Sequence, residues 1–198
     1  MDLAPAPVLT FDTFIPAPSN HGALDTLLAW PAWPAPALLL LGPEGSGKTH
    51  LGEAWLARSR GVFIDDAHTR EDGQLFGFIN RALRGEIPGL LLASRVAPND
   101  WGVQLPDLRS RLSAMPKLQL GEPDDASLRP IARALFERRG RVVGEDVLDF
   151  LMRHAPRDVP DLRATIAELD DAARAENRDV TKAFVAKRLR ENLDLFED

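Results

Sequence analysis

Short apolar runs alternate with amphipathic stretches through the first part of the chain. The runs are typical of strands that are buried on both faces, and they lie at residues 37–41, 61–66, 89–94 and 117–120. Between them, apolar side chains recur at helical spacing over residues 48–58 and 71–84. In the second helix we expect the core-facing residues to be Leu75, Phe76, Ile79, Ala82 and Leu83. Strands that alternate with helices predict an α/β core on a parallel sheet.

Beyond residue 121 the pattern predicts helices and no further strand. Apolar stripes at helical spacing comprise Leu128, Ile131, Ala132, Leu135 and Phe136; Leu162, Ile166, Leu169 and Ala173; and Val185, Leu189 and Leu193. A shorter helix is expected around Leu148, and Thr181 is the expected N-cap of the last helix. We therefore expect three segments: a Pro-rich N-terminal segment at 1–36 with a short helix near 23–30, an α/β core at 37–121 and a small helical lid at 122–198.

A complete phosphate-loop pattern, G-x-x-x-x-G-K-[ST], follows the first apolar run directly. Its residues are Gly42, Pro43, Glu44, Gly45, Ser46, Gly47, Lys48 and Thr49. Glycines let consecutive backbone N–H groups surround phosphates, and the helix that follows directs its positive dipole end at the same anion. Lys48 is expected to reach the β- and γ-phosphates, and Thr49 to bind Mg²⁺. The pattern predicts a site for ADP or ATP with Mg²⁺.

Polar residues near the ends of later elements extend this candidate site. At the end of the second run, Asp65 is expected to hold Mg²⁺ and Asp66 to orient an attacking water. Ser94 ends the third run, where it either senses the γ-phosphate or simply ends the strand. Arg109 and Arg111 precede the fourth run, where either could enter a neighbouring subunit's nucleotide site as an arginine finger or make a surface ion pair.

Composition narrows the classes of function. The chain of 198 residues is 44% hydrophobic and 27% charged, as in a globular protein. The absence of cysteine excludes disulfides and thiolate metal sites and favours a reducing compartment. A net charge of −6 argues against an extended nucleic-acid surface, and the four histidines have no metal-ligand spacing. Without a signal peptide or an apolar run long enough to cross a bilayer, the chain is expected to be cytoplasmic.

Several motifs follow one another along the chain: the Phe11–Phe14 and Pro18–Asn20 stretches and the phosphate loop that continues through His50. In this order they resemble the AAA+ proteins of the DnaA/Hda family, and particularly its Hda-type regulators of replication initiation. The resemblance implies an AAA+ core with a helical lid, adds His50 to the nucleotide site, and makes Asp65 and Asp66 the Walker B pair and Ser94 the sensor-one position. Residues 108–112 match the arginine-finger box, which makes Arg111 the finger candidate.

The sequence departs from this family's pattern in three places. Too few residues separate Lys48 from Asp65 for a further strand and helix, so we expect four strands, with an edge strand missing from the usual five. Pro160 occupies the position of the sensor-two arginine, where Arg157 or Arg163 could substitute. The clamp-binding peptide of Hda-type proteins is not evident, because residues 1–10 contain no Gln and residues 104–108 match it only superficially.

Two functions stay open at this point. The resemblance implies a nucleotide-binding regulator that acts with the DNA-loaded sliding clamp on the initiator DnaA and promotes hydrolysis of DnaA-bound ATP. The alternative is an autonomous AAA+ ATPase of the helicase-loader type, because Lys48, Thr49, Asp65 and Asp66 make hydrolysis chemically feasible. We expect at most weak intrinsic ATPase activity and no direct DNA-binding domain. A homo-oligomer, the resident nucleotide and a third reading, a scaffold without nucleotide, also stay open.

Overall fold

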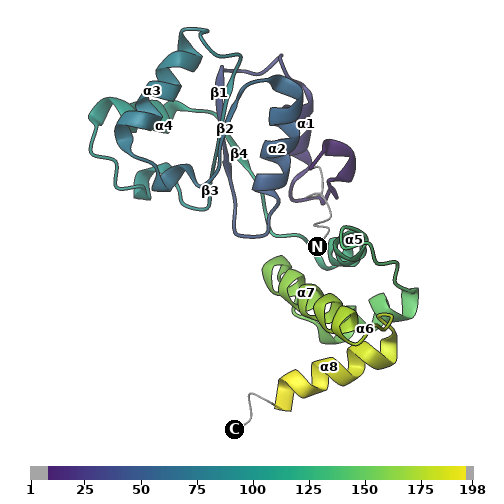
Figure 1. Cartoon of the computed structure of the whole chain (residues 1–198). Coiled ribbons are helices and arrows are strands. Elements are labelled where there is room, and N and C mark those ends of the chain that lie inside the picture. The colour runs from purple at the N-terminus through teal and green to yellow at the C-terminus, as the bar shows by residue number, and fades with distance from the viewer. Residues whose placement is uncertain (1–8, 195–198) are drawn as a thin grey trace. The chain divides into compact units, whose positions relative to one another are not determined.

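The computed structural model describes residues 9–194, with side chains through residue 190. The chain divides into two compact units, one that ends at Glu122 and one that begins at Pro123. The first is an α/β structure and the second is all-helical in its described part (Figure 1). Residues 1–8 of the predicted Pro-rich segment, including most of the stretch without Gln, lie outside the described residues, as does the side chain of Leu193.

A four-stranded parallel sheet lies at the centre of the first unit. Its strands are β1 (Ala37–Leu41), β2 (Val62–Ile64), β3 (Leu90–Ser94) and β4 (Lys117–Gln119), in the spatial order β2-β3-β1-β4. All three pairings are parallel, and the register sets Leu41 beside Ser94. The predicted number of strands is confirmed, and β2 pairs with β3 alone, so it forms one edge of the sheet.

Helices cover both faces of this sheet because successive strand side chains point to opposite faces. Leu38, Leu40 and Leu91 pack with α1 (His21–Leu28) and α2 (Lys48–Ser59). Leu39, Leu90 and Leu92 pack with α3 (Asp72–Leu83) and α4 (Pro106–Ala114). Figure 1 shows these two pairs of helices on either side of the strands. The continuous apolar runs are therefore explained by burial on both faces.

Two predicted details differ from the structure. Leu75, Ile79 and Ala82 of α3 are buried as expected, but Leu83 is 51% exposed. It is the last residue of α3, where the helix ends at Arg84. The strand predicted at 61–66 is shorter, because Asp65 lies beyond it and Asp66 adopts a left-handed conformation with φ of 46°.

The Trp-Pro-Ala-Trp-Pro stretch at residues 30–34 is a packed loop. Trp33 stacks on Trp55 of α2 with ring centroids 4.8 Å apart, and its indole N–H donates to the Thr26 carbonyl at 2.9 Å. Trp30 meets both rings edge-on. A Cβ atom at Gly89, the residue before β3, would lie 2.5 Å from the Trp30 ring, so the close approach of this ring favours glycine there. The loop closes the apolar layer between α2 and the sheet.

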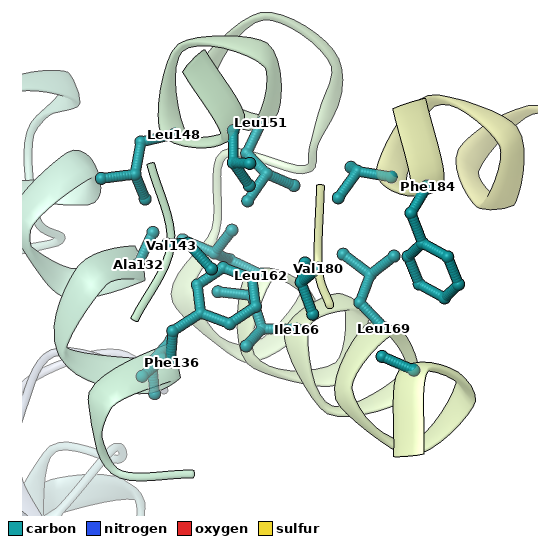
Figure 2. Close-up of a cluster of buried hydrophobic side chains, with 14 of the residues drawn as sticks. Ala132, Phe136, Val143, Leu148, Leu151, Leu162, Ile166, Leu169, Val180 and Phe184 are labelled. Carbon is teal, nitrogen blue, oxygen red and sulfur yellow. The ribbon is translucent and has the colours of Figure 1, made fainter. Parts of the chain in front are cut away.

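Four helices form the described part of the second unit. They are α5 (Asp125–Glu137), α6 (Glu145–His154), α7 (Val159–Ala175) and α8 (Lys182–Asp194). Figure 2 shows the side chains that meet between them, and every predicted stripe contributes to this core. Asp124, Asp158 and the predicted Thr181 cap three of the helices by accepting backbone N–H bonds. The stripes are confirmed for all members whose side chains are described.

One buried carboxylate lies at the edge of this helical core. Asp170 of α7 is 2% exposed and accepts hydrogen bonds from Nε of Arg141 at 2.8 Å and from Nε of Arg174 at 2.9 Å. Burial alone would raise the pKa of Asp170, but the two arginines outweigh it and hold the pKa below its ordinary value. This ionic cluster fastens the loop after α5 to α7.

Candidate functional site

The phosphate loop, residues 42–49, connects β1 to α2 in a conformation that requires its glycines. Gly45 and Gly47 have φ values of 76° and 96°, which side-chain-bearing residues rarely adopt. Gly42 meets a different constraint, because a Cβ atom there would lie 2.6 Å from the Leu120 carbonyl oxygen. The glycines of the sequence pattern are therefore the residues that this loop conformation requires, and the loop leads directly into the first turn of α2.

The N-terminal segment braces this loop. A Cβ atom on Gly47 would lie 2.7 Å from the Phe14 ring, so the aromatic ring lies against the loop backbone. His50, a predicted nucleotide-binding residue, meets the same ring edge-on, and its Nε2 lies 2.8 Å from the Thr10 carbonyl oxygen. His50 is thus held by Thr10 and Phe14 of the N-terminal segment, and the Phe11–Phe14 stretch supports the loop.

Lys48 is buried, and its ammonium group lies over the loop. Nζ donates hydrogen bonds to the carbonyl oxygens of Gly42 at 2.9 Å and Pro43 at 2.7 Å. Burial lowers the pKa of Lys48, and the nearby charges of Asp65, Asp66 and Glu44 oppose that shift. The Lys48 ammonium group is thus already beside the loop, where it could exchange these carbonyl oxygens for the oxygens of a bound phosphate.

The loop fits a polyphosphate by its unused polar groups. The hydroxyl of Ser46 is buried and has no hydrogen-bond partner among the described residues. The N-cap of α2 is Gly47, which offers no side chain to the unpaired N–H groups of the first turn. An anion would satisfy both sets of donors at once, and α2 directs the positive end of its dipole at the same place.

Thr49 and Asp65 form a second, oxygen-rich part of the site. The Thr49 hydroxyl donates to Oδ2 of Asp65 at 2.6 Å, and the backbone N–H of Asp66 donates to Oδ1 at 3.0 Å. The described residues contain no group of three or more His, Asp or Glu side chains that could hold a metal ion. One carboxylate and one hydroxyl still suit Mg²⁺, which usually keeps several waters and takes phosphate oxygens.

Ser94 is fully buried, and its hydroxyl is engaged in the turn that follows β3. It donates to the Val96 carbonyl at 2.8 Å and accepts from the Val96 N–H at 2.9 Å. These bonds show how Ser94 ends the strand. A role in sensing phosphate stays a prediction.

His68 is a residue near the site that the sequence did not single out. Its Nδ1 lies 3.2 Å from the Ser94 hydroxyl and 4.0 Å from a carboxylate oxygen of Asp66. It lies in the short 3₁₀ helix Ala67–Thr69, which follows β2, so the fold brings it next to the end of β3. Its position two residues after the acidic pair is the only sequence signal.

The two arginines of α4 differ in their surroundings. Arg109 donates from Nη2 to the Val103 carbonyl at 2.6 Å and is thereby tied to its own loop. Arg111 places its guanidinium 5.1 Å from the centre of the Phe76 ring, and no ion pair or hydrogen bond engages it among the described residues. Arg111 is therefore the arginine of α4 that is available to another molecule.

The superficial clamp-peptide match at 104–108 is folded into the first unit. Its first two N–H groups, those of Gln104 and Leu105, both donate to Oδ2 of Asp72. Leu108, the last residue of this stretch, is fully buried. The stretch is thus the entry to α4, and its anchor side chain is held within the core.

Within the helical unit, Pro160 lies in the first turn of α7, where its missing N–H costs nothing. Arg157 is paired with Asp125. Arg163 is exposed. Burial lowers the pKa of Arg138, and the positive charge of Arg163 adds to that shift. Each of these contacts lies within the unit, and neither arginine can be assigned the sensor-two role.

No helix of the described chain combines the length and apolarity needed to cross a membrane.

The parallel sheet, the phosphate loop and the helical lid define an AAA+ P-loop protein. Domain III of the Thermotoga maritima replication initiation protein DnaA superimposes with a TM-score of 0.74 at 18% identity, over 96% of this chain and 98% of that one. AMPPCP-bound DnaA from Aquifex aeolicus gives a TM-score of 0.71 at 16% identity, over 95% of this chain and 70% of that one. These likenesses establish the fold.

The helical unit carries the family resemblance. Residues 124–189 match the family model described as Hda, lid domain. The helical unit is therefore similar to the lid of Hda proteins, and the chain as a whole has the fold of DnaA domain III. It is also 26% identical to an uncharacterized protein of Haemophilus influenzae, over 77% of this chain and 80% of that one.

Proposed function

We propose that this chain is a nucleotide-binding regulator of replication initiation that promotes hydrolysis of the ATP bound to DnaA. The observation that carries the regulatory role is the match of residues 124–189 to the Hda lid. The solved DnaA from Aquifex aeolicus is bound to AMPPCP, which supports a nucleotide on the same fold. The phosphate loop with its unpaired Ser46 hydroxyl supports nucleotide binding by this chain itself.

In this proposal ADP or ATP is held by the phosphate loop, and Mg²⁺ by Thr49 and Asp65. Lys48 moves from the loop carbonyls to phosphate oxygens, and the first turn of α2 donates its backbone N–H groups. Bound Mg²⁺ would neutralise phosphate charge. His50 packs edge-on against Phe14, whose ring lies against the loop backbone, and so supports the loop. Asp66 is the residue that could orient a water.

The action on DnaA is assigned to Arg111. An arginine finger must be a cation without an internal partner, because a neutralised guanidinium would stabilise the transition state less. Arg111 rests on the Phe76 ring and meets this condition. The sliding clamp is a further proposed partner, and its binding segment is not assigned to any described residue.

An autonomous ATPase is the second candidate, favoured by one observation. Asp65, which accepts the Thr49 hydroxyl bond, and the exposed carboxylate of Asp66 stand together at the end of β2, as hydrolysis in the chain's own site requires. In this case turnover would occur without DnaA.

The experiment uses purified DnaA from the same organism, loaded with α-labelled ATP, together with DNA-loaded clamp and the full chain. We expect the wild-type chain to accelerate formation of labelled ADP on DnaA, and Arg111→Ala to slow it by about a thousandfold or to the unstimulated rate. Arg84→Ala is the matched control, because Arg84 is an exposed arginine of the same unit that pairs only with Glu86.

Turnover of free ATP by the chain alone, at about 1 s⁻¹ or faster, would favour the autonomous ATPase. Unchanged DnaA hydrolysis with the wild-type chain would exclude the regulatory role, and equal stimulation by Arg111→Ala would remove the finger assignment alone. Wild-type and variant chains should first be shown to unfold at the same temperature.

A further inference from the structure

Arg95 is placed by the sheet at the edge of the phosphate loop. It directly follows Ser94, whose register partner Leu41 directly precedes the loop. The two segments remain joined beyond the strands, because the Gly42 N–H donates to the Ser94 carbonyl at 3.2 Å. Since the carboxyl ends of parallel strands meet at one edge, Arg95 leaves the sheet on the side where the loop lies.

The order of the strands also shows which parts of the site lie on either side of Arg95. β3 lies between β1, which leads into the loop, and β2, which leads to Asp65. A side chain that follows β3 therefore stands between the phosphate loop and the candidate magnesium ligand. That is the region in which the phosphate farthest from the ribose would lie, because Lys48 and Thr49 open α2 on the same edge.

The guanidinium of Arg95 already faces the loop. Its Nη1 lies 3.8 Å from a carboxylate oxygen of Glu44, with side chains 57% and 72% exposed. An exposed pair at this distance contributes little and is easily exchanged for a stronger partner. Burial is the main cause of the lowered pKa of Lys48, and the charge of Arg95 acts in the same direction, so the two cations share one local field.

We propose that Arg95 binds the terminal phosphate of a nucleoside triphosphate, exchanging Glu44 for phosphate oxygens. The inference rests on the proposed nucleotide site. A guanidinium fork matches phosphate geometry in two parallel hydrogen bonds, which a lone, exposed carboxylate contact at 3.8 Å does not supply. Arg95 would then supply a phosphate-binding cation from the α/β unit. The resemblance expects such a cation at the sensor-two position, where this chain has Pro160.

The proposal also gives Glu44 a role. In the nucleotide-free protein its carboxylate holds Arg95 beside the loop, and a bound triphosphate replaces it. A diphosphate, which lacks the terminal group, would leave the Arg95–Glu44 pair in place. Arg95 therefore distinguishes triphosphate from diphosphate within a loop that grips both.

The test is calorimetric titration of the full chain with Mg²⁺ and either ADP or the non-hydrolysable AMPPCP. We expect Arg95→Gln to weaken AMPPCP binding about tenfold or more and ADP binding less than threefold. The matched control is Arg84→Gln, an exposed arginine paired with Glu86 away from the loop, which should change neither affinity. Glu44→Gln should strengthen AMPPCP binding in the wild-type background and have no effect beside Arg95→Gln.

Equal AMPPCP affinity for wild type and Arg95→Gln would overturn the inference and leave Arg95–Glu44 as a surface ion pair. Equal losses for ADP and AMPPCP would overturn the assignment to the terminal phosphate. If the wild type binds neither nucleotide, the proposed nucleotide site fails and the inference falls with it. Thermal unfolding of each variant identifies any loss that comes from misfolding.

Discussion

The Thr49 hydroxyl donates a hydrogen bond to Oδ2 of Asp65 at 2.6 Å, which joins the first turn of α2 to the end of β2. In the proposed site, both oxygens would belong to the shell of Mg²⁺. We therefore expect Asp65→Asn to weaken binding of Mg²⁺-ADP by about tenfold or more, because an amide is a poorer ligand than a carboxylate. Calorimetry with Mg²⁺ and with excess chelator measures this effect.

The same variant should match the wild type when Mg²⁺ is removed, since only the metal-dependent part of the affinity is lost. Asp25→Asn, an exposed carboxylate on α1, is the control and should bind as the wild type does in both conditions. Equal losses with and without Mg²⁺ would show that Asp65 supports the loop structurally and would argue against a metal role.

Replacing Ser46 should have opposite effects on the stability of the nucleotide-free protein and on nucleotide binding. Its buried hydroxyl is without a hydrogen-bond partner in the described structure, so Ser46→Ala should raise the free energy of unfolding of the nucleotide-free protein by about 1 kcal/mol. The same change should reduce the stabilisation that saturating Mg²⁺-ADP provides. Thermal unfolding with and without nucleotide tests both expectations, and a variant that is less stable without nucleotide would contradict this reading of the site.

Gly52 is needed where α2 crosses the short edge strand. A Cβ atom there would lie 2.0 Å from the tip of the Phe63 ring on β2. Gly52→Ala should therefore lower the free energy of unfolding by about 2 kcal/mol, and Phe63→Leu should recover part of that loss. Urea unfolding followed by tryptophan fluorescence reports on this unit.

Gly77 offers the matched control. It lies in the interior of α3, and a Cβ atom there would meet nothing within 4 Å. Gly77→Ala should raise the free energy of unfolding by about 0.5–1 kcal/mol, because alanine has the higher helix propensity. If both variants shifted stability in the same direction, the crowding at Phe63 would not be the cause.

Much of the fold could be predicted because its signals are local and redundant. The run Ala37–Leu41 and the eight residues after it contain the strand, the turn and the helix start in one stretch. The stripe Leu162–Ala173 likewise specifies a buried helix face by spacing alone. Four strands could be inferred because the segment between Lys48 and Asp65 is too short for more.

The contacts of the site could not be predicted, because they depend on how strands pair. Ser94 and His68 are 26 positions apart and meet only because β2 lies beside β3. The resemblance singles out Arg111, but the surroundings of the two arginines are seen only in the fold, where Arg109 donates to the Val103 carbonyl and Arg111 lies over the Phe76 ring. The left-handed backbone of Asp66 likewise has no local pattern, since aspartate adopts that conformation only occasionally.

The last prediction concerns the helical unit and its response to acid. Because Arg141 and Arg174 hold the pKa of Asp170 below its unfolded value, near 3.9, the carboxylate stabilises the fold at neutral pH. That contribution is complete above about pH 5 and is lost as pH falls through the lowered pKa, where the folded carboxyl takes up its proton. Asp170→Asn should cost about 3 kcal/mol at pH 7, because it leaves the arginines without their buried partner.

The measurement is urea unfolding of the full chain at pH 7 and pH 3, followed by circular dichroism. The difference between wild type and Asp170→Asn should be largest at pH 7 and should shrink at pH 3, because the wild-type carboxyl is then protonated in the unfolded chain, whereas the amide of the variant does not titrate. The fluorescence of Trp30, Trp33, Trp55 and Trp101 gives an internal reference, since all four lie in the first unit. Asp179→Asn, an exposed carboxylate in the same unit, is the control. A difference between wild type and Asp170→Asn that stays constant from pH 7 to pH 3 would contradict the ionic origin of this stabilisation.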